Sequence, residues 1–202
     1  MYEIYCPESA YPFAANTYVL SSLGEAVVID PTVPKSTVDK YGLKIKYVLL
    51  THGHFDHFLE LDSYTDNGIE LLVSEECNRA IRDAELNCYR RFFGRETVYS
   101  GEATLIGEGE TVEFGDTQIT AIATPGHSAG STSFVLPDAV IVGDVCFAGG
   151  GIGRYDLPTA DYPSLQQSIQ RICALPPSYK VYPGHGESTT VEKLKRELNI
   201  YF

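Results

Sequence analysis

Short apolar runs alternate along the chain with segments whose apolar residues recur every three or four positions. Short apolar runs between turn residues are typical of β-strands, and the three-to-four spacing is typical of amphipathic helices. The pattern predicts strands over residues 16–20, 26–29, 47–51, 70–73, 112–114, 118–123, 132–136, 140–142 and 180–182. It predicts helices over residues 34–41, 55–64, 74–86, 161–174 and 190–198.

Turn residues between neighbouring strands predict three hairpins, at residues 21–25, at Gly115-Asp116 and at Pro137-Asp138. No linker, internal repeat or low-complexity segment interrupts the pattern. We therefore expect one mixed α/β domain over residues 1–202. Two similar halves, each rich in strands and followed by a helix, would fit this order of elements.

Residues 87–105 give no clear element, although they contain a distinctive run from Tyr89 to Arg95 that mixes aromatic rings with three arginines. One interpretation is a helix end with solvated charges. The other is a loop over the functional site that helps to hold an anionic substrate. The sequence leaves both open.

Composition narrows the class of protein. The chain is 44% hydrophobic and 21% charged, which is ordinary for a globular protein, and its formal net charge is −12. This charge argues against nucleic acid and anionic membranes as partners, and no apolar run is long enough to span a bilayer. Five cysteines without a CxxC pair, and no signal peptide, predict free thiols and a cytoplasmic protein of undetermined oligomeric state.

One strand end carries an unusual cluster of metal-type side chains. The apolar strand that ends at Thr51 is followed at once by His52, His54, Asp56 and His57. Their spacing does not place all four on one helix face, and Gly53 argues against a continuing strand. We infer a buried strand followed by a tight loop that brings the four side chains together. Imidazole and carboxylate donors suit zinc, iron or manganese.

Three further strands end in the same way, at a glycine-containing turn that carries one donor. His127 follows strand 118–123, Asp144 follows strand 140–142, and His185 follows strand 180–182. The chain has five histidines, and all five belong to this set. A single histidine of this kind is more often structural, but five of five in matching contexts indicate a metal centre.

Seven donors exceed the needs of one tetrahedral ion and suit two metal ions that share a carboxylate. We assign His52, His54 and His127 to the first ion. The second ion is assigned Asp56, His57 and His185, and Asp144 bridges the two. A water molecule between two such ions is acidic enough to supply hydroxide near neutral pH, which predicts hydrolysis.

These motifs resemble the metallo-β-lactamase superfamily in residues and in order. The resemblance rests on Thr51-His-Gly-His-Phe-Asp-His57, Pro125-Gly126-His127, Gly143-Asp144 and Pro183-Gly184-His185-Gly186, and it covers nearly the whole chain. It implies an α/β fold, the four-layer αββα sandwich, with the metals at one edge of the two sheets. The implied cofactors are two divalent ions, zinc first, with iron or manganese as the alternatives.

A glycine-rich segment narrows the resemblance further. Gly149-Gly-Gly-Ile-Gly-Arg-Tyr-Asp-Leu-Pro158 is similar to a segment of small glyoxalase II-like (hydroxyacylglutathione hydrolase-like) hydrolases and of persulfide dioxygenases. It implies that Arg154 and Tyr155 bind substrate and that Asp156 orients the loop. Thr159-Ala160 replaces the Gly-Gly common in the small hydrolases, and the C-terminal helical region with which full-length glyoxalase II binds glutathione is missing. These departures weaken glutathione as the predicted thiol.

We therefore expect a binuclear metal-dependent hydrolase that cleaves a small acyl thioester by attack of a metal-bridging hydroxide. Asp56 is the expected catalytic residue, because it also orients the nucleophile. One alternative is a mononuclear iron persulfide dioxygenase that uses His52 or His54 with His127 and Asp144. Another is a non-catalytic member that binds metal only for folding. The resemblance does not favour β-lactamase activity, because true β-lactamases have a different late motif and are usually exported.

Overall fold

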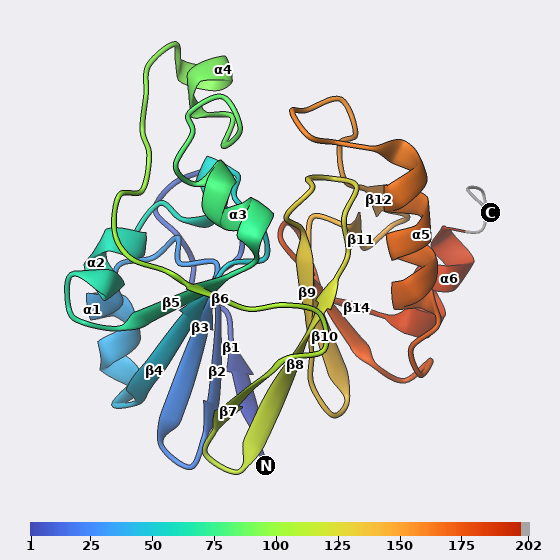
Figure 1. Ribbon diagram of the computed structural model, residues 1–202. Helices are drawn as coiled ribbons and strands as arrows, with labels where there is room; N and C mark the ends of the chain where they lie inside the picture. Colours follow the sequence, from blue (N-terminus) through green and yellow to red (C-terminus); the bar gives the residue numbers. More distant parts are fainter. Residues whose placement is uncertain (199–202) are drawn as a thin grey trace.

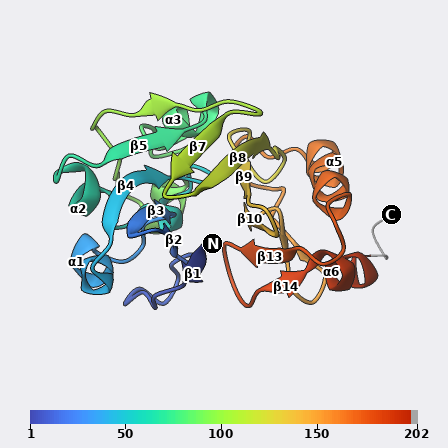
Figure 2. The same ribbon diagram turned by 90° about the horizontal axis from the view of Figure 1, so that it is seen from below.

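Two six-stranded sheets lie face to face, and helices cover both outer sides, in the computed structural model, which describes residues 1–198 (Figure 1). The view from below shows the same succession of layers (Figure 2). The predicted four-layer αββα arrangement is therefore confirmed.

The first sheet has the order β1-β2-β3-β4-β5-β6. Strands β1 to β3 are antiparallel neighbours, and β3 to β6 are parallel. The β2–β3 hairpin turns at Leu23-Gly24, where both residues have positive φ, as a two-residue hairpin loop requires. The bounds are β1 Glu3–Tyr5, β2 Tyr18–Ser22, β3 Glu25–Ile29, β4 Lys44–Leu49, β5 Glu70–Val73 and β6 Thr104–Leu105.

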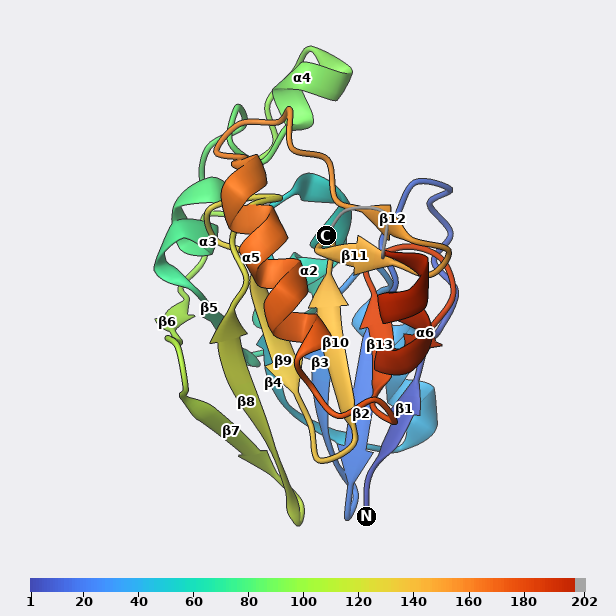
Figure 3. The same ribbon diagram turned by 90° about the vertical axis from the view of Figure 1, so that its right-hand side faces the viewer.

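The second sheet has the order β14-β13-β10-β9-β8-β7. All its neighbours are antiparallel except β10 and β13, so β8, β10 and β13 run in the same direction and end at the same edge (Figure 3). A two-stranded ribbon, β11–β12, lies beyond that edge. The bounds are β7 Thr111–Phe114, β8 Thr117–Ala123, β9 Thr132–Val135, β10 Ala139–Gly143, β11 Cys146–Phe147, β12 Gly151–Ile152, β13 Lys180–Pro183 and β14 Thr189–Thr190.

The helices form the two outer layers. Those on the first sheet come from the first half of the chain, and α5 and α6 cover the second sheet (Figures 1 and 3). The bounds are α1 Lys35–Val38, α2 Leu61–Thr65, α3 Glu75–Ala80, α4 Tyr89–Phe93, α5 Tyr162–Cys173 and α6 Val191–Glu197, with two 3-10 turns, η1 Asp39–Tyr41 and η2 Phe55–His57.

Alternating residues of each central strand face different cores. In β10, Ala139 and Ile141 pack between the sheets, whereas Val140 and Val142 pack against the helices on the outer side. The other central strands repeat this alternation. A strand buried on both faces needs apolar residues at every position, so these strands appear in the sequence as continuous apolar runs.

Two helix predictions are wrong in extent. The predicted helix over residues 55–64 is divided into η2 and α2, because Phe58 leaves helical geometry. Tertiary contacts hold this break: the Asp56 carbonyl accepts from the Ala15 N–H at 3.0 Å, and the Glu60 N–H donates to the Pro31 carbonyl at 2.9 Å. Helical periodicity carries no information about such contacts.

The helix predicted over residues 74–86 ends at Ala80. The Ile81 carbonyl accepts from the Tyr99 N–H at 2.8 Å, and the Asp83 carboxylate accepts from the Glu85 N–H at 2.8 Å. These two bonds turn the chain away from the helix axis. The strands β1, β6, β11, β12 and β14, which the pattern did not predict, have only two or three residues each and are too short to show a periodicity.

The hydroxyl of Ser74, at the start of α3, makes two hydrogen bonds, one as acceptor and one as donor. Its oxygen accepts from the Cys77 N–H at 3.3 Å, as expected of an N-cap, and its O–H donates to the Gly130 carbonyl at 2.7 Å. We expect Ser74→Ala to cost about 1–2 kcal/mol and to lower Tm by about 2–8 °C in thermal denaturation. Ser178→Ala, at an exposed position outside any helix or strand, should leave Tm within about 1 °C.

Candidate metal centre

The seven donors predicted from the sequence meet at one edge of the sandwich. Four of them lie in the loop and 3-10 turn that follow β4 of the first sheet, and three follow β8, β10 and β13 of the second. The structure groups their donor atoms into overlapping sets within 4.8 Å: His52, His54 and His127; His52, His57 and Asp144; Asp56, His57 and His185.

Three histidines form the deeper part of the cluster. The Nδ1 atom of His54 lies 3.0 Å from Nε2 of His52 and 2.9 Å from Nε2 of His127. All three side chains are buried. The grouping has the membership that the sequence assigned to the first ion.

The shallower part contains the second group and the carboxylate of Asp144. Nε2 of His185 lies 3.3 Å from Oδ2 of Asp56. Asp144 lies between the two groups, since its Oδ1 is 3.5 Å from Nε2 of His57 and its Oδ2 is 3.6 Å from both His127 and His185. This position is the one that a bridging ligand would need.

Hydrogen bonds on the outer side of the rings decide which nitrogens face inward. The Nδ1–H of His127 donates to the Arg154 carbonyl at 2.8 Å, because a carbonyl can only accept. The Nδ1–H of His57 donates to the buried Asp30 carboxylate at 2.8 Å. His127 therefore presents a bare Nε2 to the cluster, and His57 would do so once a metal ion displaced the proton on its Nε2, as in metal sites whose ligands are oriented by outer hydrogen bonds.

A relay through Thr51 orients His52 in the same way. The Thr51 O–H donates to Oδ2 of Asp30 at 2.7 Å, so its oxygen is left to accept from Nδ1 of His52 at 3.2 Å. The Thr51 N–H donates to the other oxygen of Asp30 at 2.8 Å. One buried carboxylate thus fixes two of the histidine ligands.

Burial is the largest influence on the pKa of the three deep histidines. It lowers the pKa of His52 and of His127 below the usual range for histidine, and it lowers the pKa of His54 to about 3. Neighbouring imidazoles lower the pKa of His52 and His54 further. These rings are neutral at physiological pH, which is the form that binds a metal ion.

His57 and Asp144 show how strongly the cluster couples opposite charges. Burial pushes the pKa of His57 down, but the carboxylates of Asp30 and Asp144 outweigh it and hold this pKa well above its usual value. Burial alone would raise the pKa of Asp144, yet His57 and the other nearby histidines lower it below its ordinary range. Asp144 is therefore a carboxylate, ready to act as an anionic ligand.

The cluster fits metal ions on its own geometry. Three imidazole nitrogens converge to about 3 Å of one another, and two nitrogen ligands of tetrahedral zinc are about 3.3 Å apart. Within residues 1–198, Nε2 of His57 and Oδ1 of Asp144, which both belong to the donor cluster, are buried without a hydrogen-bond partner. Buried polar atoms rarely lack a partner, and coordination would supply one.

Asp30 and Thr51 are parts of the site that our sequence analysis did not assign. Asp30 follows β3, a parallel neighbour of β4, and so lies at the same edge as the donors. Its position directly after an apolar strand is the same signal that identified Asp144. In the sequence, however, Asp30 precedes a proline and lies where the second strand of a predicted hairpin ends, so it also fits a plain turn.

A cavity of about 520 Å³ opens in front of the donors. Arg154 lines it, and the Asp156 carboxylate holds the Arg154 guanidinium through two hydrogen bonds of 2.9 and 2.8 Å. Tyr155 does not line this cavity; its side chain is 54% exposed and its ring packs against Tyr162 at 4.7 Å. Five of the seven metal-type donors line the cavity: His54, Asp56, His127, Asp144 and His185.

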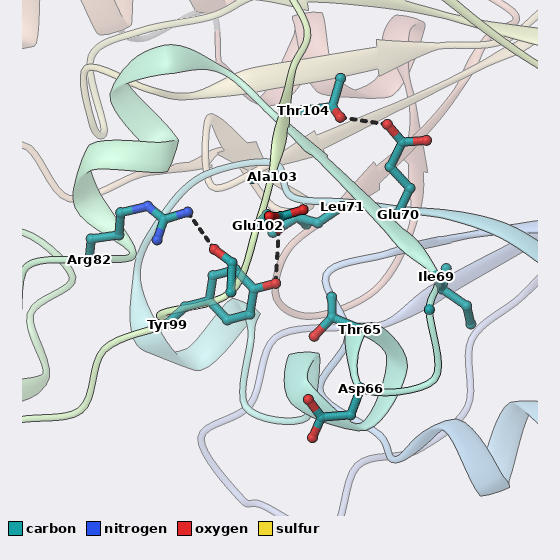
Figure 4. Close-up of a pocket in the computed structure, with 12 residues that line it drawn as sticks. Thr65, Asp66, Ile69, Glu70, Leu71, Arg82, Tyr99, Glu102, Ala103 and Thr104 are labelled. Carbon is teal, nitrogen blue, oxygen red and sulfur yellow. Dashed lines mark hydrogen bonds between the residues drawn. The ribbon is translucent and has the colours of Figure 1, made fainter.

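A wider groove of about 880 Å³ lies elsewhere, between the turn that precedes β5 and the segment that precedes β6 (Figure 4). Its hydrogen bonds are structural: Arg82 donates to the Gly101 carbonyl at 2.7 Å, and the Tyr99 O–H donates to the Glu102 carbonyl at 3.0 Å. None of the described donor groups belongs to it. The cavity at the sheet edge is therefore the candidate active site.

Residues 10–185 match the family model described as "Metallo-beta-lactamase superfamily". The chain belongs to this superfamily. A Bacillus subtilis (strain 168) protein named "Probable metallo-hydrolase YqgX" is 35% identical over 189 residues, which cover 89% of each chain. A Haemophilus influenzae protein, "Hydroxyacylglutathione hydrolase GloC", is 29% identical over 182 residues, 85% of this chain and 84% of the other.

Two solved structures are similar to this chain along nearly their whole length. "BLEG-1 B3 metallo-beta-lactamase" has a TM-score of 0.87 and 30% identity, with 97% of each chain covered. "TTHA1623 in a di-iron-bound form" has a TM-score of 0.82 and 29% identity, with 97% of this chain and 99% of the other covered. Membership of the superfamily and the His/Asp cluster together indicate a metal-dependent hydrolase. Within residues 1–198, the helices are all too short or too polar to cross a membrane.

Gly184 shows how tightly the backbone of this superfamily member encloses the donors. A Cβ at this position would lie 2.2 Å from Oδ1 of Asp144 and 2.7 Å from Cε1 of His57. We expect Gly184→Ala to displace both ligands and to weaken metal binding by roughly tenfold to hundredfold, measured by chelator competition. Gly107→Ala, whose new Cβ would meet nothing closer than 3.5 Å, should bind metal like the wild-type chain.

Proposed function

We propose that this protein is a binuclear metal-dependent hydrolase that cleaves small acyl thioesters. The supporting observation is the arrangement of seven donors as two groups, with the Asp144 carboxylate between them, facing one cavity. In this proposal His52, His54 and His127 hold one ion. Asp56, His57 and His185 hold the other, and Asp144 bridges both.

When bound, the two ions would supply an acidified water and would polarise the substrate carbonyl. The residues of the chain position the reactants. The carboxylate of Asp56, which lines the cavity 3.3 Å from Nε2 of His185, accepts a hydrogen bond from the attacking water and so directs its oxygen at the carbonyl carbon. A C–O bond forms and the C–S bond breaks. One proton of the water is taken up by the departing thiolate and the other passes to solvent, so the products are a carboxylate, a thiol and one proton.

The thioester assignment draws support from the chemistry of the cavity and from one relative. A thiolate leaves without much help from a general acid, because thiol pKa values are near 8.5. Carboxylates and imidazoles line the cavity. Among the described lining residues, Arg154 is the one lysine or arginine, and the Asp156 carboxylate already holds its guanidinium. GloC is named as a hydrolase of hydroxyacylglutathione, which is a thioester of glutathione, and this supports the reaction class here.

Metal content and turnover test the proposal together. Protein purified without added metal should contain about two divalent ions per chain, and hydrolysis of a panel of acyl thioesters should stop on chelation and return when zinc is added. Iron and manganese are assayed in parallel. A metal-loaded chain that hydrolyses none of the thioesters would contradict the proposal.

A mononuclear iron persulfide dioxygenase is the second candidate. Two histidines and one carboxylate are the usual ligands of such iron sites, and Nε2 of His127 lies 3.6 Å from the carboxylate of Asp144, with His54 beside it. This candidate predicts one iron per chain and oxygen consumption with a glutathione persulfide. Two metal ions per chain and no oxygen uptake would exclude it.

A further inference from the structure

The walls of the active-site cavity differ sharply from its floor. The floor carries the metal-type donors, whereas the walls consist largely of apolar side chains: Phe13, Phe55, Phe92, Phe93, Phe147, Ile152 and Leu157. The wall begins directly at the donors, because Phe55 precedes Asp56 in the chain and both line the cavity. An apolar surface is therefore continuous with the reaction centre.

Three phenylalanines form a connected part of this wall. The ring of Phe55 lies 5.3 Å from Phe93 and 5.8 Å from Phe13, and Phe13 lies 5.9 Å from Phe93. Of these three, Phe55 is buried, and Phe13 and Phe93 are each 42% exposed; the neighbouring Phe92 is 51% exposed. Helix α4, which carries Phe92 and Phe93, projects above the sheet edge (Figure 1). Clustered exposed apolar rings of this kind usually mark a binding surface.

The side chains of the cavity walls, away from the metal-type donors, argue against an anionic tail in the same place. Among the described lining residues, Arg154 is the one lysine or arginine, and the Asp156 carboxylate already holds its guanidinium in two bonds. Arg91 acts on Asp156 electrostatically but does not line the cavity. The carboxylates of a glutathione moiety would meet phenyl rings without a free cation, and an unpaired charge beside apolar groups is unfavourable.

We propose that this cavity prefers thioesters whose apolar acyl chain lies against its walls. Thioesters that place an anionic peptide thiol, such as glutathione, against the same walls are the poorer substrates. This inference rests on the proposed thioesterase function and specifies its substrate class. Phe92 and Phe93 are the specificity-determining side chains in the proposal. They would cover the part of the acyl chain that lies away from the metals.

A matched series of substrates measures this selectivity. The zinc-loaded chain is assayed with acetyl, butyryl and hexanoyl thioesters of N-acetylcysteamine, and with hexanoyl-glutathione. Burial of each methylene should raise kcat/KM about fourfold, so that hexanoyl, with four more methylenes, exceeds acetyl by roughly 250-fold. Hexanoyl-glutathione should be no better than its N-acetylcysteamine counterpart. A flat series, or a glutathione thioester more than tenfold faster, overturns the proposal.

Variants of α4 test the role of its rings. In the double variant Phe92→Ala/Phe93→Ala, the ratio of kcat/KM for hexanoyl over acetyl should fall at least tenfold. The ratio is informative even if part of the protein misfolds, because both substrates are measured on the same folded population. Leu105→Ala removes a side chain that is 53% exposed on β6, outside the cavity, and should leave the ratio unchanged. An unchanged ratio in the double variant contradicts the proposal.

A binding measurement separates this inference from the thioesterase proposal. Hexanoate and acetate carry the same carboxylate and differ only in apolar length, so calorimetric titration of the zinc-loaded chain reports on the wall alone. If no thioester is turned over, the proposed function fails, and tighter binding of hexanoate by roughly 250-fold still supports the apolar site. Equal affinity for the two acids overturns it.

Discussion

Replacement of Asp56 by alanine is expected to reduce kcat for thioester hydrolysis by about 1000-fold or more while the chain stays folded. Asp56 lines the cavity, is partly exposed and pairs with His185, so its loss removes an anionic ligand and the group that directs the attacking water. A 1000-fold loss corresponds to about 4 kcal/mol of transition-state stabilisation. The measurement is steady-state kinetics of the variant, with circular dichroism to confirm its fold.

The metal content of this variant gives a second and independent result. We expect it to fall from about two ions per chain to about one, because the deep group of His52, His54 and His127 does not use Asp56. Asp62→Ala, which removes an exposed carboxylate from α2, should keep both ions and full activity. Wild-type activity in Asp56→Ala would disprove the proposed role of this residue.

Asp30→Ala is expected to be the most destabilising single substitution near the site. The buried carboxylate accepts from the Thr51 N–H, the Thr51 O–H and Nδ1–H of His57. Its removal leaves three buried donors without an acceptor, and breaking such a buried network costs about 3–5 kcal/mol. Thermal denaturation of the metal-free chain should show a loss in Tm of about 6–20 °C.

Asp30→Asn keeps the shape of this residue and changes only its hydrogen bonding. An amide nitrogen cannot accept from His57, so Nδ1 would give up its proton and Nε2 would carry it toward the cluster. We expect metal affinity to fall by roughly tenfold to hundredfold with a smaller loss of stability than in Asp30→Ala. Chelator competition measures the first effect and thermal denaturation the second. An unchanged metal affinity would show that Asp30 has no role in orienting the ligand.

The strand ends made the donor cluster predictable from the sequence. Each donor lies in the turn or loop that follows a strand, and the apolar residues of these strands, continuous and fully buried in β10, are easy to recognise. Parallel strand directions then bring their ends to one edge. The grouping of His54 with His127, which are 73 residues apart, followed from counting donors and from the resemblance of the motifs.

Other features depended on contacts that the sequence does not encode locally. The break between η2 and α2 results from hydrogen bonds to Ala15 and Pro31, which are far from it in the chain. Residues 87–105 gave two interpretations, and the structure places α4 there with Phe92 and Phe93 on the cavity wall. The position of these two rings on the cavity wall depends on their contacts with segments far away in the chain. A short aromatic run in the sequence does not reveal such contacts.

The division of the donors between the two sheets has a consequence for how the protein unfolds. His54 and His57 belong to the first sheet, and His127, Asp144 and His185 belong to the second, so a bound ion joins the halves as a reversible cross-link. Neither half alone offers a complete set of ligands. Free metal at 100 times its Kd adds about 2.7 kcal/mol to the stability of the joined state only. Metal concentration therefore sets how cooperatively the two halves melt.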